Sequence, residues 1–522
     1  MAIIGKNVIE NLTTAMYEDL KIIYREYIQN SADSIDKAIS LGVIDEDEAK
    51  IDIEIDAEKN IIRIIDNGIG IKKDSFKRVM SSIAASDKDL NNNKGFRGIG
   101  RLGGISSCKI LKFITTSKGE NVKSTCVWNA KKVKDILIDK NQNPTADNLV
   151  DSVTEYYIDD CNKDDHYFVV ELIGIDESSR ELLDEKNVKE YLKFVAPIPY
   201  DKSFMFSSKI MEFAEKHGFR IDTYNVFVNG DRLFKPYTNK LYEPHNFSKK
   251  GYDEIVDIKF HIFEDNDKNI LAWMWYGICK FEKQIPQINS MRGIRLRKSN
   301  IQIGNENTFT SHNFYKEPRG ALYFIGEVFA VNSHLIPNAR RDYFNLNDVC
   351  RDFEDKLKAL FYDRFYQIYH YANEYKKILQ VQIEAKDLQK KFKEKENTGF
   401  IDAEDKKKAE NKIIEMEEKV KKAIKKQELR DTKEKDDDVL SRVYDALKKT
   451  YNTKVEDENI NLTLEKNVGK TNEKTKFITQ SLSQYNKREQ KLISKIYMII
   501  NKILPKDTAD LVISKIQEDL QK

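Results

Sequence analysis

The sequence predicts an α+β protein that ends in a helical region, and three features support this prediction. Residues 17–40 place apolar side chains at helical spacing, and the segments that follow alternate apolar and polar residues as half-buried strands do. After residue 345, long amphipathic segments of helical period replace the strand patterns. At 522 residues the chain is too long for one hydrophobic core, so we expect several domains.

Five segments are expected along the chain. The stretch "KIDIEIDAEKNIIRIIDNG" is typical of two strands joined by a polar turn, so the first segment is a helix-covered sheet. Strands such as "IVDIKFHIF" and "AWMWYGICKF" indicate a second, mixed α/β domain. The helical part divides into a helical hairpin or coiled coil, a polar linker and a final pair of helices that is a candidate for dimerisation or partner binding. The predicted boundaries are 1–185, 186–348, 349–451, 452–475 and 476–522.

The composition narrows the class of protein. Lys and Arg number 88 against 86 Asp and Glu, so the overall charge indicates neither DNA binding nor a membrane surface, although a local basic patch remains open. Five scattered cysteines form no C-x-x-C pair, which predicts neither a zinc site nor a disulfide framework. With no signal-peptide pattern and no apolar run long enough to span a bilayer, we expect a cytoplasmic protein.

The stretch "YREYIQNSADSIDKA" places Glu26, Asn30 and Asp33 on one face of the first helix, at spacings of four and three. On this stretch alone, the simpler interpretation is a solvated polar face. The alternative is that the three side chains point at one ligand.

Two glycine-bearing motifs follow the helix. In "IIDNGIGI", Asp66 ends an apolar strand and is followed by Gly68 and Gly70, so a carboxylate can accept a hydrogen bond from an exocyclic amine while backbone approaches a flat ligand. The alternative for this motif is an ordinary turn. In "KGFRGIGRLGG", the loop before a probable helix offers backbone N–H groups to phosphate. It is neither a dinucleotide fingerprint nor a P-loop.

In this order, the motifs resemble those of the GHKL (Bergerat-fold) ATPase superfamily, which includes gyrase-type topoisomerases, ninety-kilodalton heat-shock chaperones, histidine kinases and MutL-type proteins. "YREYIQNSADSIDK" is similar to the chaperone N-box, and "GFRGIG" to its glycine box. "GFRGIGRLGGISS" and the preceding "AASDK" also resemble the MutL-type versions. The resemblance implies an ATP-binding Bergerat sandwich, a middle transducer-like domain, and ATP and Mg²⁺ as cofactors.

The resemblance also implies a role for each motif residue. Glu26 would be the general base, Asn30 the Mg²⁺ ligand, Asp33 a support of the pocket and Asp66 the reader of adenine. The pocket and lid would be shaped by Gly68, Gly70, Gly95, Gly98 and Gly100, with Ile99 also among the cofactor-binding residues. Phosphate contacts would come from Ser86, Lys88 and Arg97, for which a solvated loop position is the alternative. Relatives usually carry a Gly-Thr pair in a late strand; here "DDHYFVVEL" lacks it, and Tyr167 or Phe168 takes that place.

In the second domain, "GIRLRKSNIQI" and "GEVFAVNSHLIPNARRDYF" resemble segments of the chaperone middle domain. The resemblance implies that Arg341 reaches across to stabilise charge on the γ-phosphate, with Lys298 and Arg340 as alternatives. A structural role for these cations, solvating loops or pairing with acids, is also open. The resemblance ends near residue 345.

We therefore expect a slow, Mg²⁺-dependent ATPase that acts as a conformational switch, forms a homodimer and acts on a protein client or effector. Bacterial proteins of this divergent type suggest antiviral defence. The alternative is a MutL- or MORC-like DNA clamp, or a scaffold that uses ATP as a structural ligand. A histidine kinase is disfavoured, because none of the seven histidines has a phosphoacceptor setting.

Overall fold

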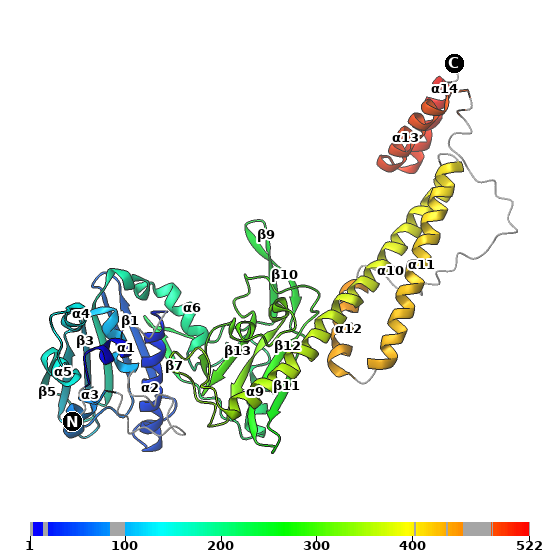
Figure 1. The fold of residues 1–522 in the computed structure, drawn as a ribbon. Helices are drawn as coiled ribbons and strands as arrows, with labels where there is room; N and C mark the ends of the chain where they lie inside the picture. Colours follow the sequence, from blue (N-terminus) through cyan, green and yellow to red (C-terminus); the bar gives the residue numbers. More distant parts are fainter. Residues whose placement is uncertain are drawn as a thin grey trace. The chain divides into compact units, whose positions relative to one another are not determined.

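Three β-sheets and their helices make up the first unit of the computed structural model, Met1–Cys279 with Lys283–Gln367 (Figure 1). In the second unit, Lys280–Glu282 with Ile368–Lys522, the regular elements of the described residues are all helices. The structure describes residues 4–13, 19–83, 100–400, 403–434, 437–452, 482 and 484–520. The predicted fold class, α+β followed by a helical region, is confirmed.

The first sheet has eight strands in the order β5-β4-β3-β6-β2-β1-β7-β8, antiparallel except for the parallel pair β1–β7. Its central strands bury alternate residues, such as Ile51 and Ile53 on β1, while Lys50 and Glu54 are exposed. One face therefore carries the core. The strands are β1 Lys50–Asp56, β2 Ile61–Asp66, β3 Cys108–Thr116, β4 Val122–Trp128, β5 Thr154–Asp160, β6 Tyr167–Ile175, β7 Asn225–Val228 and β8 Asp231–Arg232.

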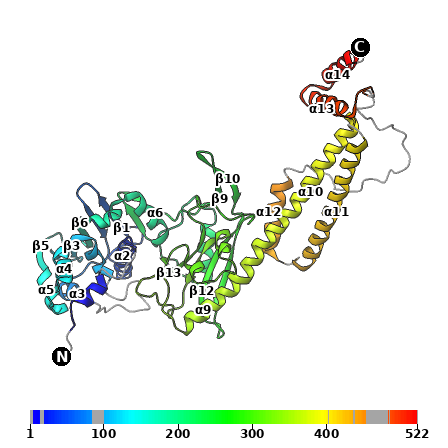
Figure 2. The same ribbon diagram turned by 45° about the horizontal axis from the view of Figure 1, so that its top comes forward.

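The core face of this sheet is covered by helices (Figure 2). The longest, α2, lies along β1 and β2, while α3, α4 and α5 contact β4, β3 and β5. Helix α2 starts at Ile22, five residues after the predicted start. The elements are α1 Asn7–Thr13, α2 Ile22–Ser40, α3 Lys73–Ser81, α4 Ala130–Ile138, α5 Ala146–Val153 and α6 Glu185–Val195, with the 3₁₀ turns η1 Gly100–Ser106 and η2 Glu177–Leu183.

The first sheet extends beyond the domain boundary that the sequence predicts at residue 185. Strands β7 and β8 come from residues 225–232, and Val226 and Val228 are fully buried in the core of this sheet. The pairing of β7 with β1 is long-range in sequence, and the alternation within a short strand does not specify its neighbour.

A five-stranded sheet, in the order β11-β12-β15-β13-β14, forms the second part of this unit. β12 and β15 are buried along almost their whole length, so both faces of the sheet are covered. The strands are β11 Asp257–Glu264, β12 Ile270–Ile278, β13 Gly293–Lys298, β14 Ile301–Ile303 and β15 Ile325–Ala330, with the separate hairpin β9 Lys240–His245 and β10 Ser248–Glu254. The helices are α7 Ser207–Lys216, α8 Thr308–Ser311, η3 Pro318–Tyr323, α9 Asp348–Lys358 and the π-helical turn η4 Ala359–Phe365.

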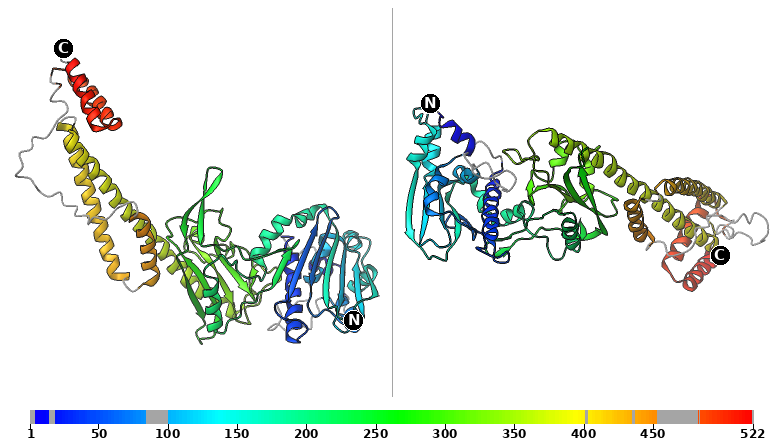
Figure 3. Two further views of the ribbon diagram at one scale, coloured as in Figure 1. Left: turned by 180° about the vertical axis from the view of Figure 1, so that it is seen from behind. Right: turned by 90° about the horizontal axis from the view of Figure 1, so that it is seen from below.

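The second unit contains α10 Tyr366–Thr398, α11 Ala403–Glu434, α12 Asp438–Asn452, α13 Lys487–Ile503 and α14 Lys506–Leu520. Gly399, with φ of 101°, follows α10, and α10 and α11 lie side by side in every view (Figures 1 and 3). The last two helices flank Pro505 and pack together. Of the predicted polar linker, residues 452–475, all positions after Asn452 lie outside the described residues. No described helix is long and apolar enough to cross a membrane.

A cluster of fully buried charges ties the second sheet to the segment before it. Glu327 on β15 accepts hydrogen bonds from Lys235 (3.2 Å), Arg297 and Tyr200. Lys235 also donates to Asn300 Oδ1 at 2.7 Å. Burial and the neighbouring Arg297 charge lower the pKa of Lys235 to about 7, and the Glu327 carboxylate only partly offsets them. Burial alone would raise the pKa of Glu327, but the two cations outweigh it and lower that pKa to about 2.

The low pKa of Lys235 predicts a pH-dependent stability. The pKa of an unfolded lysine is about 10.4, so between about pH 7 and pH 10 the unfolded chain holds a proton that the folded chain has lost. Lys235 should therefore raise the free energy of unfolding as pH rises through that window, by at most about 1.4 kcal/mol per pH unit. In urea unfolding at pH 7 and pH 9, the difference in unfolding free energy between the native protein and Lys235→Met should change with pH. The same difference for the exposed Lys202→Met control should stay constant with pH. An equal change for the two variants would contradict the assignment.

Candidate active site

Two of the three motif residues on α2 are buried. Glu26 and Asp33 are each 7% exposed, and Asn30, one turn after Glu26, is half-buried. A solvated helix face does not describe Glu26 or Asp33, because water reaches little of either carboxylate. The face of α2 that carries them is turned toward other parts of the first unit.

The carboxylate of Glu26 lies between a cation and a glycine. Arg341 Nε is 2.7 Å from Glu26 Oε1, and the N–H is not aligned with that oxygen, so the contact is an ion pair. On the other side, a Cβ added to Gly100 would overlap Glu26 Oε2. Gly100 opens η1, at the end of the glycine motif. A side chain at this position would therefore force the Glu26 carboxylate to shift.

Arg341 sits in a strained loop that closes on itself. Its φ is +54°, in the left-handed region that residues other than glycine rarely adopt. The loop holds this conformation with a bridge between Pro337 and Phe344 and with a hydrogen bond from Gly304 N–H to the Arg341 carbonyl (2.8 Å). Strained backbone of this kind clusters at functional sites.

Helix α2 binds the backbone of the same loop. Arg25, next to Glu26, is buried and donates to the carbonyls of Arg340 (3.3 Å) and Arg341 (3.5 Å). Of the three predicted basic candidates, Arg341 is the one in contact with Glu26. The side chain of Arg340 is exposed, and the Lys298 ammonium donates to the Asn332 carbonyl at 2.6 Å. Burial lowers the pKa of Lys298 to about 8.

Asp66 ends β2 as predicted and is 2% exposed. Its Oδ1 accepts a hydrogen bond from Gly68 N–H at 3.0 Å. A Cβ on Gly68 would overlap Ser34 Oγ on α2, and a Cβ on Gly70 would overlap the Thr116 carbonyl on β3. Gly70 also has a φ of +65°. The loop is therefore clamped between a helix and a strand, which an ordinary turn would not require.

Thr115 is a residue of this region that the sequence analysis missed. Phe168 lies opposite Asp66 in the β2–β6 ladder, where the family pattern has its Gly-Thr pair, and Thr115 on β3 lies opposite Phe168. The buried Thr115 hydroxyl donates to the Tyr167 carbonyl (2.7 Å) and accepts from Ile71 N–H (3.0 Å). A hydroxyl thus holds the loop after Asp66, although it comes from a different strand. In the sequence, the three hydroxyl residues "TTS" (115–117) at the end of β3 were the available signal for such a contact.

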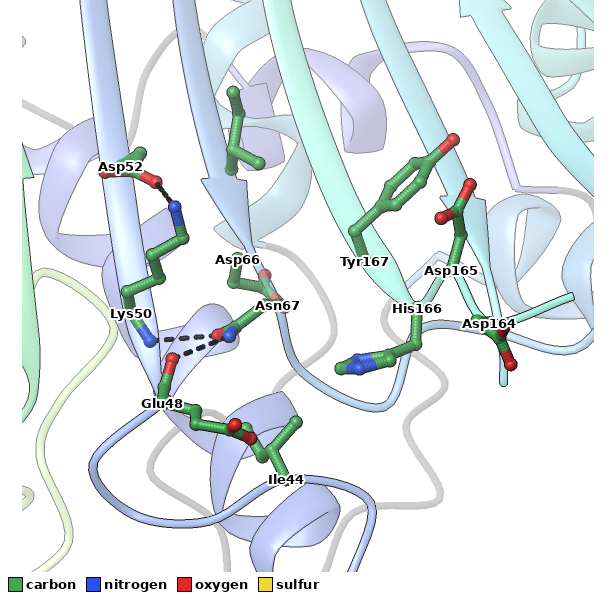
Figure 4. Close-up of a pocket in the computed structure, with 11 residues that line it drawn as sticks. Ile44, Glu48, Lys50, Asp52, Asp66, Asn67, Asp164, Asp165, His166 and Tyr167 are labelled. Atoms are coloured by element: carbon green, nitrogen blue, oxygen red, sulfur yellow. Dashed lines mark hydrogen bonds and ion pairs between the residues drawn. The ribbon is translucent and has the colours of Figure 1, made fainter. Parts of the chain in front are cut away.

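A cavity of about 420 Å³ lies beside the same loop, at the ends of β1, β2 and β6 (Figure 4). His166 Nδ1 is 3.0 Å from the Gly68 carbonyl. Side chains alternate across a strand, so Asp52 and Ile65 line the sheet face opposite to the Asp66 side chain. The acidic residues in the lining are Glu48, Asp52, Asp66, Asp164 and Asp165, of which Asp66 directs its side chain to the other face. Such a lining repels phosphate, so this cavity does not suit the phosphate end of a nucleotide.

Six predicted lid residues lie outside the described residues, namely Ser86, Lys88, Gly95, Arg97, Gly98 and Ile99. Within the described part of the chain, no group of three or more His, Cys, Asp or Glu could hold a metal by itself. Mg²⁺ bound with a nucleotide usually takes phosphate and water oxygens and only one or two protein ligands. The half-buried Asn30 amide beside Glu26 fits that role.

The fold and these contacts correspond to a known class of domain. Residues 17–167 match the family described as histidine kinase-, DNA gyrase B-, and HSP90-like ATPase. The predicted resemblance is confirmed: the chain carries a GHKL-type ATPase domain.

The chain is also similar to proteins called chaperone protein HtpG. The relative from Clostridium botulinum (strain 657 / Type Ba4) is 24% identical over 299 residues, 49% of this chain and 47% of the relative. The relative from Sulfurovum sp. (strain NBC37-1) is 26% identical over 200 residues, 35% and 28% of the two chains. The relative from Campylobacter jejuni (strain RM1221) is 38% identical over 78 residues, 14% and 13%. The chain thus spans about half the length, or less, of these relatives.

The clamped loop predicts that Gly70→Ala disrupts the fold near Asp66. The left-handed backbone costs an alanine roughly 1–2 kcal/mol, and the overlap with the Thr116 carbonyl adds to it. Urea unfolding should show a loss of about 2 kcal/mol or more. Gly251→Ala is the matched control, because its Cβ would meet nothing within 4 Å. Equal stability of both variants would contradict the clamp.

Proposed function

We propose that the protein binds Mg·ATP in the first domain and hydrolyses it slowly, with Glu26 as the general base. The observation that supports this most is the ion pair between Glu26 and Arg341. It joins the helix of the ATPase domain to a loop more than three hundred positions later in the chain, where the resemblance expects a catalytic arginine.

In this proposal each residue has one task. Asp66 accepts a hydrogen bond from the adenine amine, Asn30 supplies an oxygen ligand to Mg²⁺, and Asp33 supports the pocket. Glu26 takes the proton from the attacking water, which requires a carboxylate held at a fixed place. Arg341 holds that carboxylate and offers positive charge to the phosphoryl group being transferred. Because Arg341 belongs to a loop outside the ATPase domain, turnover depends on the docking of that loop.

The dependence on docking supports a conformational switch rather than a simple hydrolase. The relatives are called chaperones, so we propose a protein client or effector. On the family resemblance alone, we propose the cytoplasm as the compartment and bacterial antiviral defence as the pathway. A pull-down with the Glu26→Ala variant, expected to retain ATP, would identify that partner.

We further propose that the protein is a homodimer. Helix α13 exposes an apolar stripe at spacings of four, three and four: Leu492, Ile496, Ile499 and Ile503. A stripe of this width is ordinarily buried against another helix. Light scattering of the native protein and of a Leu492→Glu, Ile499→Glu variant would test this.

Glu26→Ala should abolish hydrolysis while ATP still binds. Loss of a general base lowers turnover by roughly 10²–10⁴-fold. ATP binding should remain, because the Glu26 carboxylate has no proposed contact with adenine. Asp66→Asn should weaken ATP binding by about tenfold or more, because the amide cannot accept the same charge-assisted hydrogen bond. Phosphate release and nucleotide titration measure the two effects. Hydrolysis by Glu26→Ala at the native rate would refute its role.

Arg341→Ala should lower turnover by roughly 10²-fold or more with ATP affinity nearly unchanged. Arg340→Ala is the matched comparison, since it removes the same side chain from the neighbouring, exposed position. Arg341→Lys should restore little, because a compact ammonium lacks the planar set of N–H donors that a guanidinium offers to phosphoryl oxygens. If Arg340→Ala lost turnover and Arg341→Ala kept it, the two residues would have to exchange roles.

A further inference from the structure

The β9–β10 hairpin stands away from the rest of the first unit (Figure 3). Among the described strands, β9 and β10 pair only with each other. The base is held firmly: the Asn289 side chain accepts from Tyr242 N–H (2.8 Å) and donates to the Tyr242 carbonyl (2.7 Å), and Lys283 pairs with Glu243. An isolated two-stranded ribbon is barely stable in water, so these contacts fix it in a projecting position.

The tip of the hairpin presents an aromatic ring to water. Asn246, with φ of 51°, and Phe247 form the two-residue turn, and Phe247 is fully exposed, at 109% of its reference area. Turns of this length favour Gly, Asn or Asp. Neither the turn nor the packing of the unit requires a phenylalanine here.

More apolar side chains are exposed around the base. Met205 N–H donates to Asn239 Oδ1 beside the start of β9, and Val256 directly follows β10. Ile288 precedes Asn289, and Met211 lies on α7, whose Lys209 pairs with Asp257. With Phe247, these four residues are all the large apolar side chains exposed between residues 200 and 340. We call the five residues the hairpin surface. Methionines adapt to varied apolar partners.

The outer half of the hairpin is basic. Residues 244–252 contain the exposed Lys249 and Lys250 and no carboxylate, although charges over the whole chain nearly balance. Glu243 lies opposite Lys250 in the ladder, but its carboxylate is already paired with Lys283. Lys249 Nζ lies 4.4 Å from the centre of the Tyr242 ring. Lysines beside a free strand edge discourage pairing with uncharged or basic strands. A strand that carries carboxylates could pair beside these lysines, because the opposite charges attract.

From these observations we infer that the hairpin surface binds an extended polypeptide segment that carries both apolar and acidic side chains. The apolar side chains would pack on Phe247 and the methionines, and the carboxylates would pair with Lys249 and Lys250. This inference rests on the proposed function in that it names the kind of client, but the binding itself does not require hydrolysis. Two lysines are too few for firm contact with a DNA backbone.

The test measures binding of a labelled, unstructured peptide of alternating Leu and Glu residues to the full-length protein by fluorescence anisotropy. A second peptide replaces every Glu with Lys. Phe247→Ser should weaken binding of the acidic peptide at least fivefold. Lys249→Glu with Lys250→Glu should weaken the acidic peptide by a similar factor and improve the basic one. Ile138→Ser, at an exposed apolar position on α4, is the control and should change neither by more than twofold.

Equal binding by Phe247→Ser and the native protein would overturn the inference, and so would equal affinity for the two peptides. Competition by duplex DNA or by vesicles containing phosphatidylserine, lost in the double lysine variant, would assign the hairpin to those partners instead. Phe247→Ser should hydrolyse ATP normally, and Glu26→Ala should bind the acidic peptide. A failure of this inference is thereby distinguishable from a failure of the proposed ATPase.

Discussion

The contact between Glu26 and Arg341 is the interaction on which the organisation of the first unit depends. A nearly buried carboxylate without a counter-charge would cost several kcal/mol, so the docked loop stabilises the place of Glu26 on α2. The strained backbone at Arg341 persists because Gly304, Arg25 and the bridge of Pro337 to Phe344 all hold the loop. The ATPase domain and the segment beyond it thus share one site.

Close packing around the glycines sets the shape of that site. Gly68 touches α2, Gly70 touches β3 and Gly100 touches Glu26. Each leaves room for backbone or a carboxylate where a side chain would stand. The same loop is held by the Thr115 hydroxyl, which shows that the support of Asp66 can come from another strand than the family pattern suggests.

The motifs of the candidate site were predictable because they are local. Glu26, Asn30 and Asp33 share a helix, and Asp66, Gly68 and Gly70 share a loop, so spacing alone places them together. The hydroxyl side chains of "TTS" were visible in the sequence, but the contacts of Thr115 depend on which strand lies beside β6. For the same reason the parallel pairing of β7 with β1 was missed, and the buried cluster of Lys235, Arg297 and Glu327 gave no sign in a chain rich in charges.

By itself, the sequence determined the fold class, the helical end of the chain and the identity of the ATPase domain, because periodicity and motif order are properties of neighbouring residues. The tertiary structure alone decided which of three cations meets Glu26. Arg340 and Arg341 are adjacent and chemically the same, and only the left-handed turn at Arg341, held from both sides, directs its guanidinium to the Glu26 carboxylate while Arg340 is exposed.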